Sequence, residues 1–370
     1  MIQNDIKKLG FGLMRLPMNG EEVDAAQTNE MVDKFLQKGF TYFDTAYGYI
    51  NGKSEETVKT ALVDRYPRDQ FLVATKLPAW ADAKNADEAI QMFYTSLKRT
   101  GAGYFDYYLL HNCGGERTKV FTDFGIWEFL AKQKQKGLIK NLGFSFHDKA
   151  DVLEQLLTDH PEMDFVQLQI NYADWENDTV QSRQCYEVAR AHGKSIIIME
   201  PIKGGSLANL PDDIAQPMKD YAPDRSLSSW ALRYAASLEG VITVLSGMSS
   251  TEQMEDNLST FEHFEPLSTE ELDVIAEVQS RLANSHGIPC TNCKYCVKDC
   301  PMQIPIPRVF SSMNTYLVYN NLQGAKGNYK WIDKEYFASK CIECGQCEMV
   351  CPQQIKIIDE LKRVAETLED

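Results

Sequence analysis

The chain has 370 residues, which exceeds the usual size of one domain and predicts one large domain with a smaller one. Its 44% hydrophobic and 25% charged residues are ordinary for a soluble globular protein, whereas a net charge of -15 argues against nucleic acid or an anionic membrane as partner. The N-terminus lacks an apolar stretch of signal-peptide length, and we expect no segment that spans a membrane.

Eight short apolar segments, rich in β-branched and aromatic residues, are predicted strands. They cover residues 9–14, 41–45, 71–76, 106–111, 139–145, 165–170, 195–199 and 241–246. Amphipathic segments between them predict helices, among them 28–38, 87–100, 148–158, 226–238 and 251–261. This alternation predicts an α/β fold, a closed parallel (β/α)8 TIM barrel. The alternative is an open doubly wound sheet, which the count of eight strands and the missing Gly-x-Gly-x-x-Gly after the first strand disfavour.

The C-terminal part contains two cysteine runs of equal spacing, each followed by a proline (Pro301 and Pro352). In such a run three thiolates bind one cubane cluster and the fourth, before the proline, binds the other cluster. The spacing therefore predicts two [4Fe-4S] clusters, one held by Cys290, Cys293, Cys296 and Cys351 and the other by Cys341, Cys344, Cys347 and Cys300. The alternatives are disulfides and zinc ribbons, although zinc sites need pairs of Cys-x-x-Cys.

Helical patterns accompany these runs, at residues 267–283 before them, 309–320 between them and 358–368 after them. We therefore expect a barrel over residues 1–265, a connecting helix over 266–286 and a small, mostly helical ferredoxin-like domain over 287–370. Cluster thiolates need a reducing compartment, so the predicted location is cytoplasmic.

Ionisable side chains end three predicted strands: Asp44, Lys76 and His111, with Tyr49 five residues past Asp44. Active sites of such barrels lie at the C-terminal ends of strands. Hydride reduction of a carbonyl builds negative charge on oxygen, which needs a proton and hydrogen-bond donors. A nearby ammonium would lower the pKa of the Tyr49 phenol and make it a better donor. The alternatives are a structural ion pair, a packed histidine, and Tyr47 in place of Tyr49.

Four motifs between residues 9 and 260 resemble the aldo-keto reductase family: FDTAYGY followed by GKSE (43–55), VATK (73–76), LLHN (109–112) and LGFS (142–145). The resemblance implies a catalytic tetrad of Asp44, Tyr49, Lys76 and His111. In it Tyr49 donates the proton, His111 orients the carbonyl oxygen and Asp44 holds Lys76 by an ion pair. It also implies an extended nicotinamide dinucleotide that binds across the strand ends without a Rossmann fold.

The resemblance implies contacts to NADP(H) or NAD(H), with Ser145 and Gln167 at the carboxamide and Asn257 at the adenine end. The other implied contacts are Met14, Arg15, Asp44, Met199, Ile202, Lys203, Gly204, Gly247 and Gln253. The sequence departs from the family pattern in three ways. Phe146 replaces an Asn after the Ser, Met199 replaces a Tyr that stacks on nicotinamide, and Gln253 with Gly247 replaces cations that grip the 2′-phosphate of NADP.

With its two cysteine runs, the whole chain resembles the iron-sulfur members of that family. Hydride transfer moves two electrons and a cluster carries one, yet no flavin fingerprint is present to convert between them. We predict nicotinamide-dependent reduction of an aldehyde or ketone to an alcohol, with structural or redox-sensing clusters. One alternative is single-electron delivery through the clusters without nicotinamide, fed by a ferredoxin or flavodoxin-type partner. The other is a non-catalytic electron carrier. The expected substrate is a small-molecule carbonyl compound.

Overall fold

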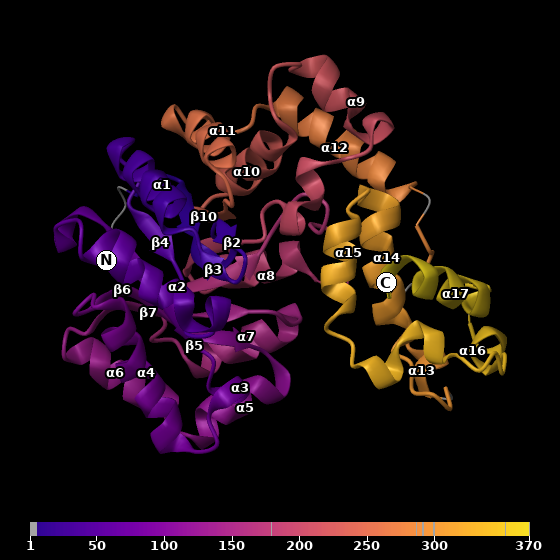
Figure 1. Ribbon diagram of the computed structural model, residues 1–370, viewed down its shortest axis with the longest axis horizontal. Coiled ribbons are helices and arrows are strands. Elements are labelled where there is room, and N and C mark those ends of the chain that lie inside the picture. The colour runs from indigo at the N-terminus through magenta and orange to yellow at the C-terminus, as the bar shows by residue number, and fades with distance from the viewer. Residues whose placement is uncertain are drawn as a thin grey trace. The chain divides into compact units, whose positions relative to one another are not determined.

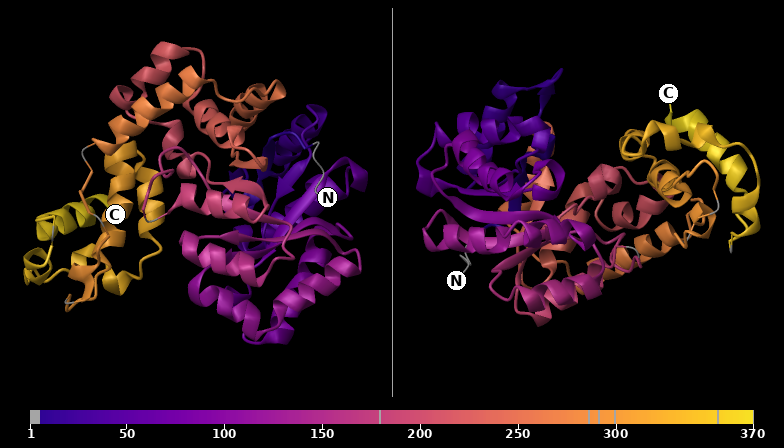
Figure 2. Two further views of the ribbon diagram at one scale, coloured as in Figure 1. Left: turned by 180° about the vertical axis from the view of Figure 1, so that it is seen from behind. Right: turned by 90° about the horizontal axis from the view of Figure 1, so that it is seen from below.

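The structure is a computed structural model that describes residues 6–178, 180–285, 287–290, 292–298, 300–351 and 353–369 (Figures 1 and 2). Pro352, which closes the second cysteine run, lies outside the described residues. The chain forms two compact units. Unit 1 comprises Met1–Pro201 with Ser229–Ser268, and unit 2 comprises Ile202–Ser228 with Thr269–Asp370. Over the described part of the chain, no helix has both the length and the apolar character that crossing a membrane requires.

Unit 1 contains a closed barrel of eight strands, in the order β1-β10-β9-β8-β7-β6-β5-β4, and every neighbouring pair is parallel. The strands are β1 Leu9–Gly12, β4 Tyr42–Asp44, β5 Leu72–Leu77, β6 Phe105–Cys113, β7 Ile139–Phe146, β8 Phe165–Gln169, β9 Ser195–Met199 and β10 Val241–Gly247. The predicted TIM barrel is confirmed, and each of the eight predicted segments overlaps one of its strands, although β5, β6, β7 and β10 extend one or two residues beyond the predicted ends. A small antiparallel hairpin, β2 Met18–Asn19 with β3 Glu22–Val23, was not predicted.

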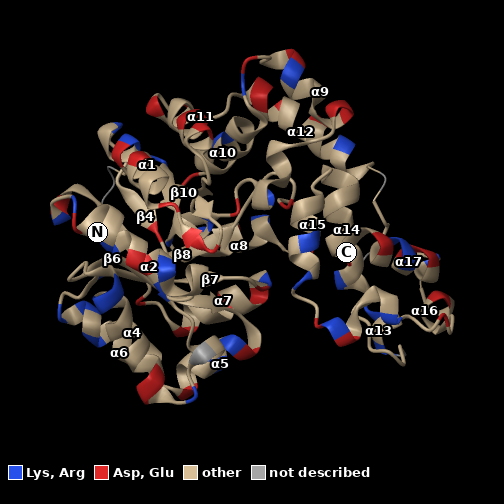
Figure 3. Cartoon of the chain, in the orientation of Figure 1, with Lys and Arg blue, Asp and Glu red and all other residues tan. Residues whose placement is uncertain are grey.

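Helices surround these strands (Figure 1). They are α1 Ala25–Gln37, α2 Lys53–Thr57, α3 Ala79–Asp82, α4 Ala86–Thr100, α5 Gly115–Asp123, α6 Ile126–Gln135, α7 Ala150–Asp159, α8 Ser182–Ala191, α10 Leu227–Ser237 and α11 Thr251–Glu262. In α4 the Asn85 side chain caps the first turn by accepting from the Glu88 N–H at 3.0 Å, and Gly101 ends the helix with φ 63°. The outer faces carry charges of both signs, as on α1 (Figure 3).

Side chains inside the barrel form layers, because alternate residues of a strand point to the same side. An apolar layer consists of Tyr42, Ala74, Tyr107, Leu109, Phe165, Ile197 and Leu245. Two residues further along the same strands stand six residues of the predicted site: Asp44, Lys76, His111, Gln167, Met199 and Gly247. The alternation of the strands therefore places these residues in one layer at the C-terminal end of the barrel, above an apolar floor.

Gly143 on β7 leaves the space that this floor requires. A Cβ added there would lie 2.4 Å from the Phe165 carbonyl oxygen and 2.8 Å from the Phe165 ring. Because the nearest atom belongs to the backbone, a side chain could not be accommodated by a rotamer change. The glycine thus lets the Phe165 ring fill the barrel beneath Ser145 and Gln167.

Unit 2 is built from helices in all its described regular structure, which confirms the predicted mostly helical C-terminal domain. Its helices are α9 Asp212–Tyr221, α12 Thr269–Ala283, α13 Tyr295–Lys298, α14 Ile306–Tyr319, α15 Leu322–Tyr329, α16 Gln346–Met349 and α17 Ile357–Leu368. Helix α9 packs on α12, and α14 packs on both α15 and α17 (Figure 1). A continuous apolar core, with Val309, Phe310, Tyr329, Leu361 and Val364 among its buried residues, joins the last three.

The two cysteine runs have matching backbones. Left-handed residues occur at Asn292 (φ 55°), Lys294 (φ 65°) and Gln303 (φ 52°), and again 51 residues later at Glu343 (φ 56°), Gly345 (φ 76°) and Gln354 (φ 53°). The same offset relates the first helical residue after each run, Ile306 of α14 and Ile357 of α17. Unit 2 therefore contains an internal repeat in which each cysteine run leads into a long helix.

The compact units differ from the predicted division in two stretches. The helix α12 belongs to unit 2, and so do residues 202–228, which follow β9. A division into compact units does not test domain boundaries. The boundaries at residues 265 and 286 therefore stay a prediction.

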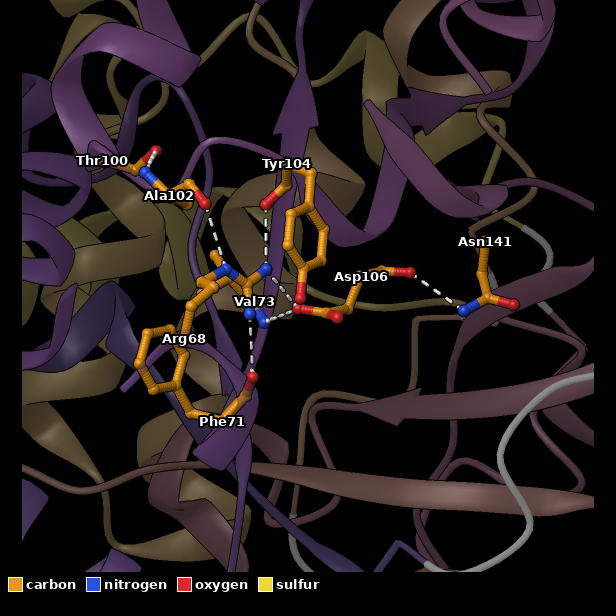
Figure 4. Close-up of polar contacts among 8 residues, drawn as sticks. All are labelled: Arg68, Phe71, Val73, Thr100, Ala102, Tyr104, Asp106 and Asn141. Atoms are coloured by element: carbon orange, nitrogen blue, oxygen red, sulfur yellow. Dashed lines mark hydrogen bonds and ion pairs between the residues drawn. The ribbon is translucent and has the colours of Figure 1, made fainter. Parts of the chain in front are cut away.

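At the N-terminal end of β6, Arg68 and Asp106 connect three chain segments (Figure 4). The guanidinium of Arg68 donates to the Asp106 carboxylate at 2.6 Å and lies 3.9 Å from the centroid of the Tyr104 ring. Its other donors bind the carbonyl oxygens of Phe71, Ala102 and Tyr104 at 2.8–3.0 Å. Asp106 also accepts from the Val73 N–H of β5 at 2.9 Å. This network fastens β5 to β6 and to the loop between α4 and β6.

Asp106→Ala would leave the Arg68 guanidinium and the Val73 N–H without their acceptor. We expect it to lower the free energy of unfolding by about 2 to 4 kcal/mol, measured by urea denaturation. The control is Asp64→Ala, which removes an exposed ion pair to Lys59 and should cost less than about 0.5 kcal/mol. Equal stability of the two variants would show that the network does not hold these strands together.

Candidate functional site

The buried ammonium of Lys76 is the centre of the polar layer in the barrel. Its Nζ donates to the Asp44 carboxylate at 2.5 Å, to the Thr45 carbonyl oxygen at 2.8 Å and to the Tyr49 hydroxyl at 3.3 Å. Lys76 and Asp44 are only 1% and 3% exposed. The structure thus brings three of the four predicted catalytic residues into direct contact, with Thr45 as a further ligand of the ammonium.

A strained turn holds Tyr49 in this position. Ile50 and Asn51 both adopt left-handed backbone angles, with φ of 51° and 54°, and Gly52 follows with φ 89°. Left-handed geometry is unfavourable for a β-branched residue such as Ile50. The turn reverses the chain directly after Tyr49, while α2 starts at Lys53 and the buried Ser54 donates to the Leu13 carbonyl oxygen at 2.9 Å.

The pKa values of the three groups follow from burial and from their mutual contacts. Burial raises the pKa of the Asp44 carboxyl, and Lys76 opposes this without reversing it. Burial alone would lower the pKa of Lys76, but Asp44 and Tyr49 outweigh it and the net shift is upward. Burial also raises the pKa of Tyr49, and Lys76 opposes it. The prediction of a lowered Tyr49 pKa is therefore wrong in its net direction, because desolvation exceeds the effect of the ammonium. The phenol is neutral and carries a proton to donate.

His111, the fourth predicted residue, lies beside Tyr49, with ring centroids 5.8 Å apart and an interplanar angle of 78°. Burial, with the nearby Lys76 charge, lowers the pKa of His111 well below its usual 6.5, so the imidazole is neutral. Its Nδ1 is buried without a partner among the described residues. The Trp80 indole N–H donates to the His111 carbonyl oxygen at 2.7 Å and fixes the backbone there.

Tyr47, the competing acid, is held elsewhere. Its ring lies 4.4 Å from the Arg99 guanidinium, which also donates to the Tyr47 carbonyl oxygen at 3.0 Å. Arg99 in turn pairs with the fully buried Glu55 at 3.4 Å. The contact to Lys76 is made by Tyr49, so geometry favours Tyr49 over Tyr47.

Ser145 and Gln167, the predicted carboxamide contacts, are register partners on β7 and β8 and are both 1% exposed. The Ser145 hydroxyl oxygen accepts from the Asn112 N–H at 2.7 Å, which leaves its own O–H free to donate. The Gln167 side chain acts to lower the pKa of Asp44 against the effect of burial, and its Oε1 is buried without a partner among the described residues. Phe146 packs against Phe144 instead, since the next residue of a strand points to the opposite side.

The predicted nucleotide contacts near β10 differ in exposure and in hydrogen bonding. A Cβ added at Gly247 would meet the Arg15 side chain at 3.5 Å, so a cationic side chain lies next to this glycine. Met14 is 52% exposed. Gln253 is folded back to accept from the Ser249 N–H at 2.8 Å, and the buried Asn257 donates to the Ser246 hydroxyl at 3.0 Å.

The remaining predicted contacts follow β9. Met199, half-buried, ends that strand in unit 1. Ile202, Lys203 and Gly204 belong to unit 2, where the Ile202 carbonyl oxygen accepts from the Gly205 N–H at 3.0 Å. Gly204 and Gly205 have φ of 63° and 95°, which kinks the chain at this point.

Sequence reasoning missed Trp80 and treated Asn112 only as part of a motif. Trp80 follows Lys76 by four residues and Asn112 follows His111 directly, so nearness to a strand end was the available signal. Asn112 is left-handed with φ 59°, which allows its N–H to reach Ser145, and its side-chain Oδ1 is buried without a partner among the described residues.

Two cavities in unit 2 are lined by cysteines. One is lined by Cys290, Cys293, Cys296 and Cys351 with apolar residues such as Phe310 and Ile357, and the other by Cys300, Cys341, Cys344 and Cys347 with residues such as Met302 and Leu361. Each cavity therefore contains three cysteines of one run and the fourth of the other, which are the same groups of four that the spacing assigns to two clusters, while cluster ligation itself stays a prediction. Ile306, the first residue of α14, lines both cavities.

Backbone N–H groups donate to two of these thiols. The Glu343 N–H donates to the Cys341 sulfur at 3.4 Å, and the Asn292 N–H donates to the Cys290 thiol. Both donors belong to the left-handed residues of the repeat. Within the described residues, no three His, Cys, Asp or Glu side chains are close enough to hold a single metal ion. The two other cysteines are buried in unit 1, and burial raises the pKa of Cys185 to about 12 and that of Cys113 further still, so both thiols are unreactive.

Comparison with known proteins gives two family matches. The model of the aldo/keto reductase family matches residues 8–280, and that of a 4Fe-4S dicluster domain matches residues 289–356. An uncharacterised oxidoreductase of Bacillus subtilis is 25% identical over 286 residues, which cover 69% of this chain and 87% of that protein. An aldo-keto reductase of Mycolicibacterium vanbaalenii is 29% identical over 245 residues, 65% of this chain and 80% of its own length.

Solved structures share the fold. The holo form of an aldo-keto reductase from Bacillus halodurans has a TM-score of 0.59 at 24% identity, covering 74% of this chain and 92% of that one. An aldo/keto reductase from Klebsiella pneumoniae in complex with NADP and acetate has a TM-score of 0.60 at 22% identity, with the same coverage of 74% and 92%.

Lys76→Met would leave the buried Asp44 carboxyl without its cation. We expect a loss of roughly 3 kcal/mol in the free energy of unfolding. The double variant Asp44→Asn with Lys76→Met should recover part of this loss, because it removes the stranded charge. Urea denaturation followed by tryptophan fluorescence measures both. If the double variant were less stable than Lys76→Met, the unpaired Asp44 charge would not be the cause of the lost stability.

Proposed function

Since the chain belongs to the aldo/keto reductase family and carries a 4Fe-4S domain at its C-terminus, it is an oxidoreductase, and we propose that it reduces an aldehyde or ketone to an alcohol with a nicotinamide dinucleotide. The observation that carries the proposal is the buried Lys76 ammonium, which contacts Asp44 and the Tyr49 hydroxyl together. A neutral phenol beside a neutral imidazole offers two hydrogen-bond donors to one carbonyl oxygen.

The residues have distinct roles in this proposal. Tyr49 gives its proton to the carbonyl oxygen as negative charge develops there, and the adjacent Lys76 ammonium stabilises the phenolate that remains. Asp44 keeps Lys76 charged in its buried position. The neutral His111 donates to the same oxygen and sets its direction. A nicotinamide dinucleotide, when bound, would supply the hydride that the carbonyl carbon accepts.

Several side chains suit a dinucleotide. The buried Gln167 Oε1 needs an N–H donor and the Ser145 hydroxyl needs an acceptor, and a carboxamide offers both. Arg15 beside Gly247 provides a cation near the end of β10, where a 2′-phosphate would be bound. The solved relative from Klebsiella pneumoniae holds NADP. We therefore favour NADP(H) over NAD(H), with the remaining contacts as the family resemblance implies.

For unit 2 we propose two [4Fe-4S] clusters with crossed ligation, one per cysteine-lined cavity. Cys290, Cys293, Cys296 and Cys351 would hold the first, and Cys341, Cys344, Cys347 and Cys300 the second. Each cluster would supply one-electron chemistry. The apolar side chains of the cavities and the N–H donors to Cys290 and Cys341 suit such clusters, whose potentials depend on burial and hydrogen bonds to sulfur. Their thiolates require a reducing compartment, which we take to be the cytoplasm.

A second candidate is single-electron delivery through the clusters. Cys293 and Cys344 are exposed, so an external carrier could approach either cluster closely. The exposed Lys294 lines the first cavity and Lys298 ends α13 nearby, and such cations attract acidic partners of the ferredoxin or flavodoxin type. In this candidate the barrel would receive electrons without nicotinamide.

Tyr49→Phe keeps the ring and removes the proton. We expect it to lower kcat for NADPH-dependent reduction of a model aldehyde by about 10²- to 10⁴-fold, as for loss of a general acid. Tyr47→Phe, the matched control, should stay within about threefold, since its hydroxyl is not part of the Lys76 network. Activity at the wild-type level in folded Tyr49→Phe protein would refute this acid. Reduction by a low-potential ferredoxin alone would favour the second candidate.

Paired cysteine variants test the crossed ligation. Cys300→Ala with Cys341→Ala removes two ligands of one cluster, so about four of eight irons per chain should remain. Cys300→Ala with Cys290→Ala removes one ligand from each cluster, and both clusters should be impaired. Iron and sulfide analysis with electron paramagnetic resonance distinguishes them. If instead the first pair impairs both clusters and the second pair only one, each run binds its own cluster.

A further inference from the structure

The segment after β9 belongs to the unit that contains the cysteine cavities. Residues 202–204 are predicted nucleotide contacts, yet the compact unit to which they belong also contains residues 269–370. The 3₁₀ segment Lys203–Ala208 is folded tightly, because the Ile202 carbonyl oxygen accepts from both the Gly205 and Leu207 N–H groups, at 3.0 and 3.2 Å. These internal hydrogen bonds fix the shape of the segment, and the elements that pack against it in unit 2 fix where it lies.

Those neighbours are α14 and α15, which both pack against the segment. The Lys203 ammonium lies 5.8 Å from the centroid of the Tyr319 ring, at the last residue of α14. The Asn321 amide donates to the buried Ser206 hydroxyl at 3.2 Å. The same side chain accepts from the Gly324 N–H at 2.8 Å and so caps α15. Asn321 thus ties the segment to the junction of the two helices.

Helix α14 connects this junction to the cysteines. Its first residue, Ile306, lines both cavities, and Pro307 and Phe310 line the one with Cys290. Its last residue, Tyr319, contacts Lys203. A helix of 14 residues is about 20 Å long, so α14 spans the distance from the cavities to Lys203. If loss of the cavity contents displaces the first turn of α14, the residues at its other end are displaced with it.

We propose that α14, with Tyr319 and Asn321 as positioning residues, couples occupancy of the two cysteine cavities to the segment 203–208, so that the clusters govern nucleotide affinity. The inference rests on the proposed function, since it requires that the segment contacts the dinucleotide. By linkage, the dinucleotide must in turn stabilise the clusters by the same factor. The clusters then act on hydride chemistry without passing electrons to it, which removes the need for a flavin.

Asn321→Ala tests the tie to Ser206. In anaerobic full-length protein with a full iron content, we expect the Kd for NADPH, measured by calorimetry, to rise about five- to tenfold, as for one lost hydrogen bond. The control is Asn328→Ala on the same helix, whose amide donates to Thr315 at 3.2 Å and not to the segment, and its Kd should be unchanged. Tyr319→Leu should weaken binding while Tyr319→Phe, which keeps the ring, should not.

Removal of the clusters by chelation should raise the same Kd at least as much as Asn321→Ala does, and bound NADPH should slow the loss of iron. An unchanged Kd in both Asn321→Ala and cluster-free protein, with the wild type binding normally, would overturn the coupling and leave the proposed function intact. If the wild type binds no nucleotide at all, the proposed function fails and the coupling with it.

Discussion

The contact between the Lys76 ammonium and the Asp44 carboxylate is the constraint on which the barrel site depends. Burying either charge alone would cost several kcal/mol, so each needs the other in the closed barrel. The pair requires β4 and β5 to be neighbours, which the parallel register of Tyr42–Asp44 with Leu72–Ala74 provides, and Lys76 follows two residues further along β5. Tyr49 is then placed by a turn whose left-handed residues begin directly after it.

Two levels of packing support this pair. The apolar layer of the barrel interior fills the space beneath it, with Gly143 admitting the Phe165 ring. Further down, the Arg68 and Asp106 network fastens β5 to β6. A site built on rigid strands keeps its geometry better than one built on loops, which suits a reaction that needs a proton donor at a set place.

The C-terminal unit raises a different question, because four cysteines around each cavity suit one-electron carriers while the barrel suits hydride transfer. Coupling through α14 reconciles the two without an electron path: the cysteine cavities lie at the start of the helix and the segment after β9 lies at its end. Such a device would make nucleotide binding sensitive to the state of the clusters. It would also give a physical reason for residues 202–228 to belong with the cysteine repeat.

The sequence by itself determined the periodic features. Alternating strands predicted the barrel, strand ends predicted Asp44, Lys76 and His111, and the equal spacing of the cysteines predicted two groups of four ligands, the same groups that line the two cavities. These follow from local patterns, because a strand has a period of two residues and a cluster has a preferred ligand spacing.

Tertiary structure alone decided what depends on neighbours from distant parts of the chain. Burial outweighs the ammonium in the pKa of Tyr49, and the Asn321 amide donates to the Ser206 hydroxyl across 115 residues of sequence. Desolvation and contact are properties of the folded chain, and no spacing in a sequence specifies them.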